Sequence, residues 1–431
     1  MDAAELAVAF SPQLKQVKAQ YGLKEGMWKW SLRSFIPRIG LNVSENDRLQ
    51  KIGADSFIKN YELSVEQLIF DGGRTSINQK LESIELKLSL SEIEKIASNV
   101  AESAISAYRN VLVSRAIYGI RESALVVLEE QHRILSHEVK LGLALPSDLS
   151  NADINLADAR NDLFSIKLDL IEMEQQFADM LGLYSLPVLS EKIIIYQPVS
   201  IPQPETARIL ALEQNRELNE ARYSIQKKQM EIKYSSISWL PNLHLMGGLG
   251  LRGHQYPLTS YTWSIGLSVD FSGAWLQNKF NALLGKELFN TNTAAVQNGA
   301  GFLPEPQIKF NKLQLKLALE YELENFKLIS EQVKRMAERA VERYKLADEK
   351  LQLAAKTVEF TEQRCTLEKL RLDLGQITRL QLMEALAEKT QKEVAMIQAA
   401  ASLMETEREL ERILSLKPGE LAIFSKLKGE L

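Results

Sequence analysis

The sequence predicts a mostly α-helical protein with a small β part, built as two tandem repeats. Three observations support this fold class. Similar segments recur in the same order in both halves of the chain. Apolar residues follow a helical period over long proline-free stretches, and short stretches alternate between apolar and polar residues. We expect each repeat to contain a short helix, a strand hairpin and a long coiled-coil helical hairpin.

The repeats are visible as three pairs of similar segments. They are "SFIPRIGLNV" and "SWLPNLHLMG", "YELSVEQLIFDGG" and "TWSIGLSVDFSGA", and "LGLALPSDLSNADINLADA" and "LGQITRLQLMEALAEKTQ". Pro37 and Pro241, near the start of the first pair, lack an amide donor and disfavour helix in the preceding residue. Each proline therefore suits a junction from helix to strand.

Four strands are expected, one hairpin in each repeat. They lie near 38–45, 58–70, 242–252 and 260–271. In "YTWSIGLSVDF" every second residue from Tyr261 to Phe271 is apolar, so one face of that strand is apolar and the other polar. The alternation in the second strand slips at Gln67-Leu68, which indicates a bulge or the end of the strand.

A glycine motif in the third strand has a structural explanation. Gly248, Gly250 and Gly253 spell G-x-G-x-x-G, the fingerprint of a dinucleotide-binding loop. That motif requires a helix directly after it, and the following "HQYP" cannot open one. We interpret the glycines as small residues on the inner face of a sheet.

The helical segments are unusually long. A helix from about Gly73 to Leu141 would measure on the order of 100 Å at 1.5 Å per residue, which fits a rod or tube rather than a compact globule. Repeat 1 is assigned to 1–184 with long helices at about 73–141 and 147–182, and repeat 2 to 207–416 with long helices at about 307–374 and 378–415. A linker at 185–206, with a short strand possible at "KIIIY", joins the repeats, and 417–431 form a C-terminal tail.

Repeat 2 contains an insertion. The distance along the chain from Phe271 to Gly375 is 32 residues longer than that from Phe70 to Gly142. The extra residues fall in and around "NTNTAAVQNGAGFLPEP", which is rich in Asn, Gly and Pro. We expect a loop at about 290–306, exposed beside the helices and cut first by protease.

The composition and the hydropathy of the sequence argue against several classes of protein. A net charge of −4 in 431 residues, with no basic run, argues against nucleic-acid binding. No apolar stretch reaches the roughly 18 residues of a transmembrane helix. The first residues lack the features of a signal peptide, and we expect the native precursor to carry a cleaved N-terminal signal, with Met1 an addition.

The strands can cross a bilayer only as part of a shared barrel. About 9–11 residues are enough for a tilted strand to span it, and alternating faces suit lipid outside and water inside. Four strands cannot close a barrel, and lipid does not tolerate an open sheet edge, so several chains must contribute. The expected lipid-facing residues are Tyr61, Leu63, Val65, Trp263, Ile265, Leu267 and Val269.

Over nearly its whole length the chain resembles the TolC-type outer membrane factors, the outer membrane efflux protein family. The resemblance rests on the paired Pro-strand-hairpin units, the strand ending "LIFDGG", the G-x-x-x-x-x-D-L-x-x-A pattern after the first hairpin glycine, and L-G turns in both repeats. It implies a homotrimer whose twelve-stranded β-barrel in the outer membrane continues into an α-helical periplasmic tunnel. It further implies a passive exit duct of a tripartite efflux or type I secretion system, docked to a periplasmic adaptor and an inner-membrane pump.

The resemblance also implies a gate at the periplasmic tips of the helical hairpins, at Gly142 and Gly375. The family's acidic gating positions correspond to Asp148, Gln381 and Glu384, of which Gln381 is not acidic. A basic position of the family is Ile377 here, with Arg379 nearby. The alternative is that these side chains are ordinary solvated helix ends.

No residue set predicts catalysis, a cofactor or a metal site. His132 and His137 lie about 140° apart on a helix and do not converge. Cys365 lies on an apolar seam and is expected to be a buried core thiol. The rival function is a soluble coiled-coil scaffold without a transport role, in which the strands are only loops.

Overall fold

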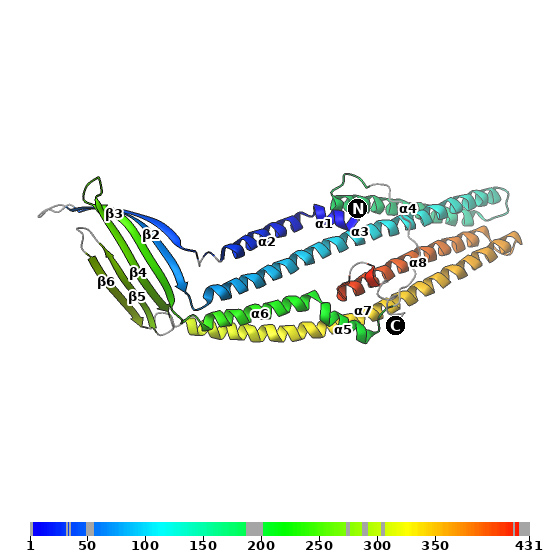
Figure 1. The fold of residues 1–431 in the computed structure, drawn as a ribbon. Helices are drawn as coiled ribbons and strands as arrows, with labels where there is room; N and C mark the ends of the chain where they lie inside the picture. The colour runs from blue at the N-terminus through cyan, green and yellow to red at the C-terminus, as the bar shows by residue number, and fades with distance from the viewer. Residues whose placement is uncertain are drawn as a thin grey trace. The chain divides into compact units, whose positions relative to one another are not determined.

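The computed structural model describes residues 3–31, 33, 36–48, 56–186, 201–272, 276–286, 292–302, 307–416 and 419–421. They form long helices and one antiparallel sheet (Figure 1). The expected fold class, mostly α with a small β part and long helical hairpins, is confirmed. The linker residues 187–200, which include "KIIIY", and most of the tail at 417–431 lie outside the described residues.

The chain divides into two compact units, and each takes segments from both sequence repeats. The sheet unit comprises Val17–Glu92 and Asn219–Lys327. The helical unit comprises Met1–Gln16, Ile93–Leu218 and Leu328–Leu431. The two units are described separately below.

The sheet unit contains six strands in the order of the sequence, each antiparallel to the next. They are β1 (Arg38–Arg48), β2 (Ser56–Phe70), β3 (Asn242–Gly253), β4 (Ser260–Ser272), β5 (Leu276–Lys286) and β6 (Asn292–Phe302). The register between β2 and β3 shifts between Leu68 and Phe70. The slip in alternation at Gln67-Leu68 is therefore a bulge and not the end of the strand.

The expectation of a loop at about 290–306 is wrong for its described part. Residues 292–302 form β6, which pairs along its length with β5, and β5 pairs with β4. Asn and Gly lower strand propensity, but pairing with a neighbouring strand outweighs such weak preferences. The sheet therefore has six strands instead of four, and a count of twelve strands for three chains does not follow from it.

Helices extend from the sheet within the same unit. The first helix after the sheet, α3 (Arg74–Lys140), begins just after Asp71, whose carboxylate accepts hydrogen bonds from the amides of Gly73 (2.8 Å) and Thr75 (2.6 Å). Burial alone would raise the pKa of Asp71, but these bonds and the charge of Arg74 outweigh it and lower the pKa. The unit also contains most of α2 (Pro12–Ser31) and α6 (Arg216–Ser236) and the start of α7 (Gln307–Asp373).

The helical unit is formed by the remaining parts of α3 and α7 together with α1 (Ala3–Phe10), α4 (Pro146–Leu181), α5 (Pro204–Gln214) and α8 (Arg379–Ile413). Its apolar seams give separate buried clusters along the helices. One cluster joins Leu128 and Leu135 of α3 to Ala152 and Leu156 of α4 and Met383 of α8. Another contains Ala7, Ala104, Val111, Phe177 and Leu181. No helix in the described part of the chain is both long and apolar enough to cross a membrane.

Candidate duct surfaces: the sheet and the helical tips

The strand registers give the sheet an apolar face that extends across all six strands. Leu63 of β2 pairs with Leu249 of β3, which pairs with Trp263 of β4. The same face carries Leu284 of β5 and Val296 of β6, because the registers continue through both added strands. These apolar side chains are exposed, Leu249 to 67% and Val296 to 68%. Such a continuous exposed apolar surface is typical of a site that contacts a membrane or another protein.

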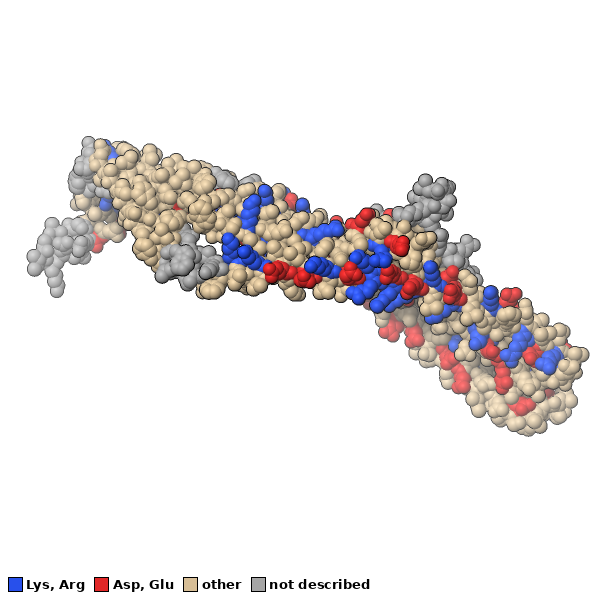
Figure 2. Space-filling view, turned by 90° about the horizontal axis from the view of Figure 1, so that it is seen from below, with Lys and Arg blue, Asp and Glu red and all other residues tan. Residues whose placement is uncertain are grey.

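All seven expected lipid-facing residues lie on this apolar face. Tyr61, Leu63, Val65, Trp263, Ile265, Leu267 and Val269 are brought together by the β2–β3 and β3–β4 registers. On the side of the molecule shown in Figure 2, charged side chains are sparse over the strands and gather along the helices. Contact of this face with lipid remains a prediction.

The opposite face of the sheet is polar and closely packed. It includes Glu62 and Ser64 of β2 and Ser264 of β4, whose hydroxyl donates to the Glu62 carboxylate at 3.4 Å. A Cβ on Gly250 would lie 2.7 Å from the carbonyl oxygen of Tyr61, and one on Gly248 would meet the Glu62 side chain. Gly248 and Gly250 therefore lie on the polar face, as predicted, and allow close approach of the neighbouring strands, whereas Gly253 lies on the opposite face.

A polar cluster lies at the end of the sheet farthest from the helices along the strands. Glu45 of β1 accepts hydrogen bonds from the hydroxyls of Tyr61 (2.7 Å) and Tyr256 (2.6 Å). Lys59 lies 3.3 Å from the same carboxylate and 4.4 Å from the centre of the Tyr256 ring. Aromatic side chains with polar tips are enriched where a barrel meets the membrane surface, so this cluster fits an interfacial position.

The two helical hairpins turn in the same way at their tips. Gly142 and Gly375 both have positive φ, 75° and 69°, and each lies after the end of a long helix. The amide of Gly142 bonds to the carbonyl of Val139, and the amide of Leu143 to that of Glu138. This is the hydrogen-bond pattern of a Schellman motif, and it recurs at Gly375. Both expected tip glycines therefore end a helix in the left-handed conformation.

Arg379, at the start of α8, makes a bidentate polar contact with the first hairpin. Its guanidinium donates to both carboxylate oxygens of Glu138 at 2.6–3.1 Å and to Gln131 at 2.7 Å. The Arg379 side chain is only 15% exposed and that of Glu138 29%. A bidentate, partly buried pair of this kind is stronger and more directional than a surface ion pair. It connects α3 to α8, and thus one hairpin to the other.

The sequence did not identify Glu138 and Gln131. A signal was present in the spacing, because Glu138 precedes Gly142 by four residues and Arg379 follows Gly375 by four. One turn of helix separates each side chain from its tip glycine, so adjacent hairpins place the two at a similar height. Spacing alone could not show that the hairpins are adjacent.

The other expected gate residues have different environments. Gln381 forms a capping box with Thr378, its side chain accepting from the Thr378 amide at 3.0 Å while the Thr378 hydroxyl accepts from its amide at 3.3 Å. Asp148 lies in the first turn of α4, where a carboxylate is favoured by the helix dipole. Glu384 is exposed and lines a groove of about 520 Å³ between α3, α4 and α8. The structure therefore does not bring these three side chains together within one chain.

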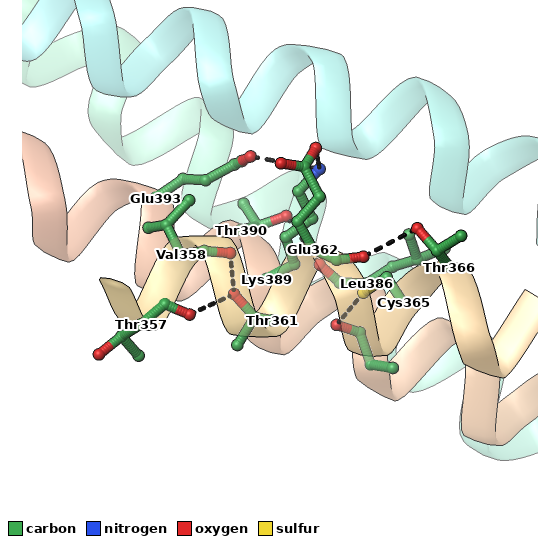
Figure 3. A network of polar contacts seen from close by, with 11 residues as sticks. Thr357, Val358, Thr361, Glu362, Cys365, Thr366, Leu386, Lys389, Thr390 and Glu393 are labelled. Carbon is green, nitrogen blue, oxygen red and sulfur yellow. Dashed lines mark hydrogen bonds and ion pairs between the residues drawn. The ribbon is translucent and has the colours of Figure 1, made fainter. Parts of the chain in front are cut away.

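A second polar network ties α7 to α8 farther from the tips (Figure 3). The ammonium of Lys389 lies 3.2 Å from Glu362 and 3.5 Å from Glu393. Burial alone would lower the pKa of Lys389, but the two carboxylates outweigh this effect and raise it. Cys365 is 5% exposed and its thiol donates to the carbonyl of Ala385 at 3.2 Å. The prediction of a buried core thiol is confirmed.

The histidines of α3 do not form a metal site among the described residues. His132 Nε2 lies 2.6 Å from the Asp153 carboxylate of α4, an interhelical contact. The described part of the chain contains no group of three or more His, Cys, Asp or Glu side chains placed to hold a metal ion.

Comparison with known proteins gives matches in structure alone. No protein-family model and no curated protein sequence matches the chain. Among solved structures, CusC, studied for its folding and transmembrane channel formation, matches with a TM-score of 0.80 at 11% identity, over 96% of this chain and 91% of CusC. The outer-membrane channel OprN matches at 0.77 and 14% identity, over 96% and 89%. The outer membrane protein VceC from Vibrio cholerae matches at 0.74 and 14%, over 96% and 95%.

Each of these matches covers 96% of this chain. Because identities of 11–14% establish the fold but not the activity, they test the architecture expected from the sequence resemblance. The long helices and the antiparallel sheet belong to that architecture. The chain has the fold of the TolC-type outer membrane channels.

Proposed function

We propose that the chain is an outer-membrane protein extending into the periplasm, and that three copies share one β-barrel that serves as a passive exit duct. The observation that carries the proposal is the sheet. It exposes an apolar face on six strands, its opposite face is polar, and each strand is long enough to cross a bilayer. An open sheet with this apolar face would leave its edges unpaired in lipid, and additional copies of the chain remove those edges.

The long helices support the proposal that the duct extends from the membrane into the periplasm. Long α-helical hairpins continue the chain from the strands, and α3 follows β2 after only three residues. Structural neighbours described as outer-membrane channels share this arrangement. We further propose that the hairpin tips meet a periplasmic adaptor and an inner-membrane pump, as in tripartite efflux or type I secretion.

The gate would combine two kinds of contact. Within each chain, Arg379 and Glu138 hold one hairpin tip to the other. Between chains, Asp148 and Glu384 would form rings of like charge around the axis, which attract cations and repel anions. The first contact is present in a single chain, and the second requires the assembled trimer.

Membrane fractionation followed by channel recording tests the proposal. The chain is expressed behind an export signal in a bacterium with two membranes, and the membranes are separated by density. We expect it in the outer-membrane fraction, released only by detergent, and conducting ions in a planar bilayer. Release into the aqueous fraction as a folded protein, without detergent, would instead support the coiled-coil scaffold.

A further inference from the structure

The added hairpin β5–β6 occupies the sheet edge of β4. Ten residues of β4, from Trp263 to Ser272, pair with β5, and the other edge of the strand pairs with β3. Both edges of β4 are therefore filled by its own chain. In a sheet of four strands the edge of β4 would be open to a neighbouring copy, but here the terminal strands are β1 and β6.

The two terminal strands have the same length and run in opposite directions. Each contains 11 residues, enough for a tilted strand to span the hydrocarbon core. Because the six strands alternate in direction, β6 of one copy runs antiparallel to β1 of the next. Backbone pairing between them therefore requires no reversal of either strand.

The composition of β6 fits a paired strand and not an exposed edge. Proteins protect free edges with charged residues, proline or bulges, and the sequence "NTAAVQNGAGF" contains no charge and no proline. Its register with β5 from Asn292 to Phe302 is also without a bulge. The middle of β1, "IGLNVS", is likewise uncharged. In lipid, unpaired amides and carbonyls along either strand would find no water to bond, which the bilayer does not tolerate.

The faces of the two strands are also compatible. On β6 the apolar face of the sheet carries Ala294, Val296, Ala300 and Phe302, with Asn298 between them, and the opposite face carries Thr293 and Gln297. On β1 the corresponding apolar residues are Ile39, Leu41 and Val43, and the opposite face carries Asn42. Pairing β6 with β1 therefore keeps Ala294 and Val296 on the same side as Leu41 and Val43, with Asn298 of β6 and Glu45 of β1 as polar residues on that side.

We infer that β6 of each copy pairs with β1 of the next, so that three copies close a barrel of eighteen strands with six from each. This inference rests on the proposed outer-membrane trimer. Barrel diameter grows roughly in proportion to strand number, so the barrel is about 1.5 times as wide as one of twelve strands. A lumen of this width accepts bulkier cargo than a twelve-stranded barrel does, wherever the periplasmic gate is open.

Cysteine cross-linking in the outer membrane tests the pairing. In a Cys365→Ser background, Leu41→Cys is combined in turn with Ala294→Cys, Val296→Cys and Asn298→Cys, because the register between copies must be sampled. We expect oxidation of at least one combination to give covalent dimers and trimers on a denaturing gel. The matched controls combine Leu41→Cys with Trp263→Cys, Ile265→Cys or Leu267→Cys of β4, which the inferred barrel keeps apart.

The outcomes separate this inference from the proposed function. Cross-links from β4 to β1 in an outer-membrane trimer would overturn the eighteen-stranded barrel and leave the duct intact. A trimer in which no β6–β1 combination links, or one in which β1 and β6 link only within a chain, would also overturn it. Absence of the trimer or of outer-membrane localisation in the unaltered chain would contradict the proposed function.

Discussion

The two repeats differ most where the second strand of each hairpin ends. After β2, Asp71 accepts two amide hydrogen bonds and α3 begins at Arg74. After β4, the sequence has Ser272 at the position of Asp71, and the chain forms a further strand hairpin before α7 begins at Gln307. The same plan therefore gives two strands in one repeat and four in the other. A local capping group starts a helix in the first repeat, and strand pairing precedes the helix in the second.

At the hairpin tips, in contrast, the two repeats have the same backbone structure and differ in their polar side-chain contacts. Both tips end at a glycine with positive φ and the same hydrogen-bond pattern. Only the second tip has a capping box, at Thr378 and Gln381, and Arg379 reaches from it to Glu138 near the first. The two tips therefore have the same backbone turn but different side-chain contacts. The capping box and the Arg379–Glu138 pair can each be removed by a separate substitution.

Among substitutions at the tips, removal of the Arg379 contact is expected to have the largest effect on the free energy of unfolding. Arg379→Ala leaves the partly buried Glu138 carboxylate without its bidentate partner. Hydrogen bonds to charged groups contribute about 1.5–3 kcal/mol to stability, so we expect the free energy of unfolding to fall by about that amount. Arg371→Ala is the control, because its side chain is 55% exposed and its single contact with Glu368 is long, at 3.5 Å, so this pair should contribute a few tenths of a kcal/mol.

Thermal unfolding in detergent measures both variants, and a double-mutant cycle with Glu138→Gln isolates the pair. A coupling energy near zero between Arg379 and Glu138 would contradict the assignment of this contact as the connection between the hairpins.

The close approach of β3 to its neighbours predicts the next largest effect. Gly250→Ala places a methyl group 2.7 Å from a backbone oxygen of β2, which cannot move freely. Overpacking of this kind typically costs about 1–3 kcal/mol. Gly247→Ala, on the other face of the same strand, has 3.8 Å of space and should fold with nearly unchanged stability. Equal yields of folded protein and equal melting temperatures for the two variants would refute the explanation of the glycines.

Capping at the start of α3 should be pH-dependent, unlike capping at α8. Loss of a capping side chain typically costs about 1 kcal/mol, so Asp71→Ala and Thr378→Ala should lower stability by similar amounts at pH 7. The folded-state pKa of Asp71 is lowered, so its contribution is present above about pH 4, the range of the unfolded value, and lost as the pH falls through the folded value.

Unfolding midpoints measured from pH 7 down to pH 2 test this difference. The difference in unfolding midpoint between wild type and Asp71→Ala should disappear in acid. The difference between wild type and Thr378→Ala should remain, because the Thr378 hydroxyl carries no charge to lose. A constant gap for Asp71→Ala over that range would show that its carboxylate charge is not what caps α3.

The smallest effect on stability is expected at the acidic tip residues. Glu384 is exposed and Asp148 half-buried, so the double change Asp148→Ala and Glu384→Ala should alter stability by less than about 0.5 kcal/mol. Its effect should appear in single-channel recordings as a weaker preference for cations and a higher resting conductance. Unchanged selectivity and conductance would identify these carboxylates as ordinary solvated helix ends.

The sequence was most informative where one residue type has few conformations available. Pro37 and Pro241 precede strands, and Gly142 and Gly375 end helices, because their backbones restrict or permit particular dihedral angles. The face of each alternating strand followed from its period. These signals predicted the fold class and the arrangement of the apolar face.

The hairpin β5–β6 and the Arg379–Glu138 contact were missed for a different reason. β6 contains three Asn or Gln and two Gly residues, so its local preference indicates a loop, and only pairing with β5 makes it a strand. Glu138 and Arg379 are 241 residues apart, and their equal spacing from the tip glycines does not show that the two hairpins are adjacent. Both features depend on tertiary contacts that local patterns do not encode.

The central claim, that copies of this chain share one membrane barrel, is tested most directly by native mass spectrometry of the protein extracted from the outer membrane in detergent. We predict one discrete species with three times the mass of the chain, whose dissociation accompanies loss of the strand signal in circular dichroism. A folded monomer that keeps its strands in detergent would contradict the claim, because it would show that the edges of β1 and β6 need no partner copy.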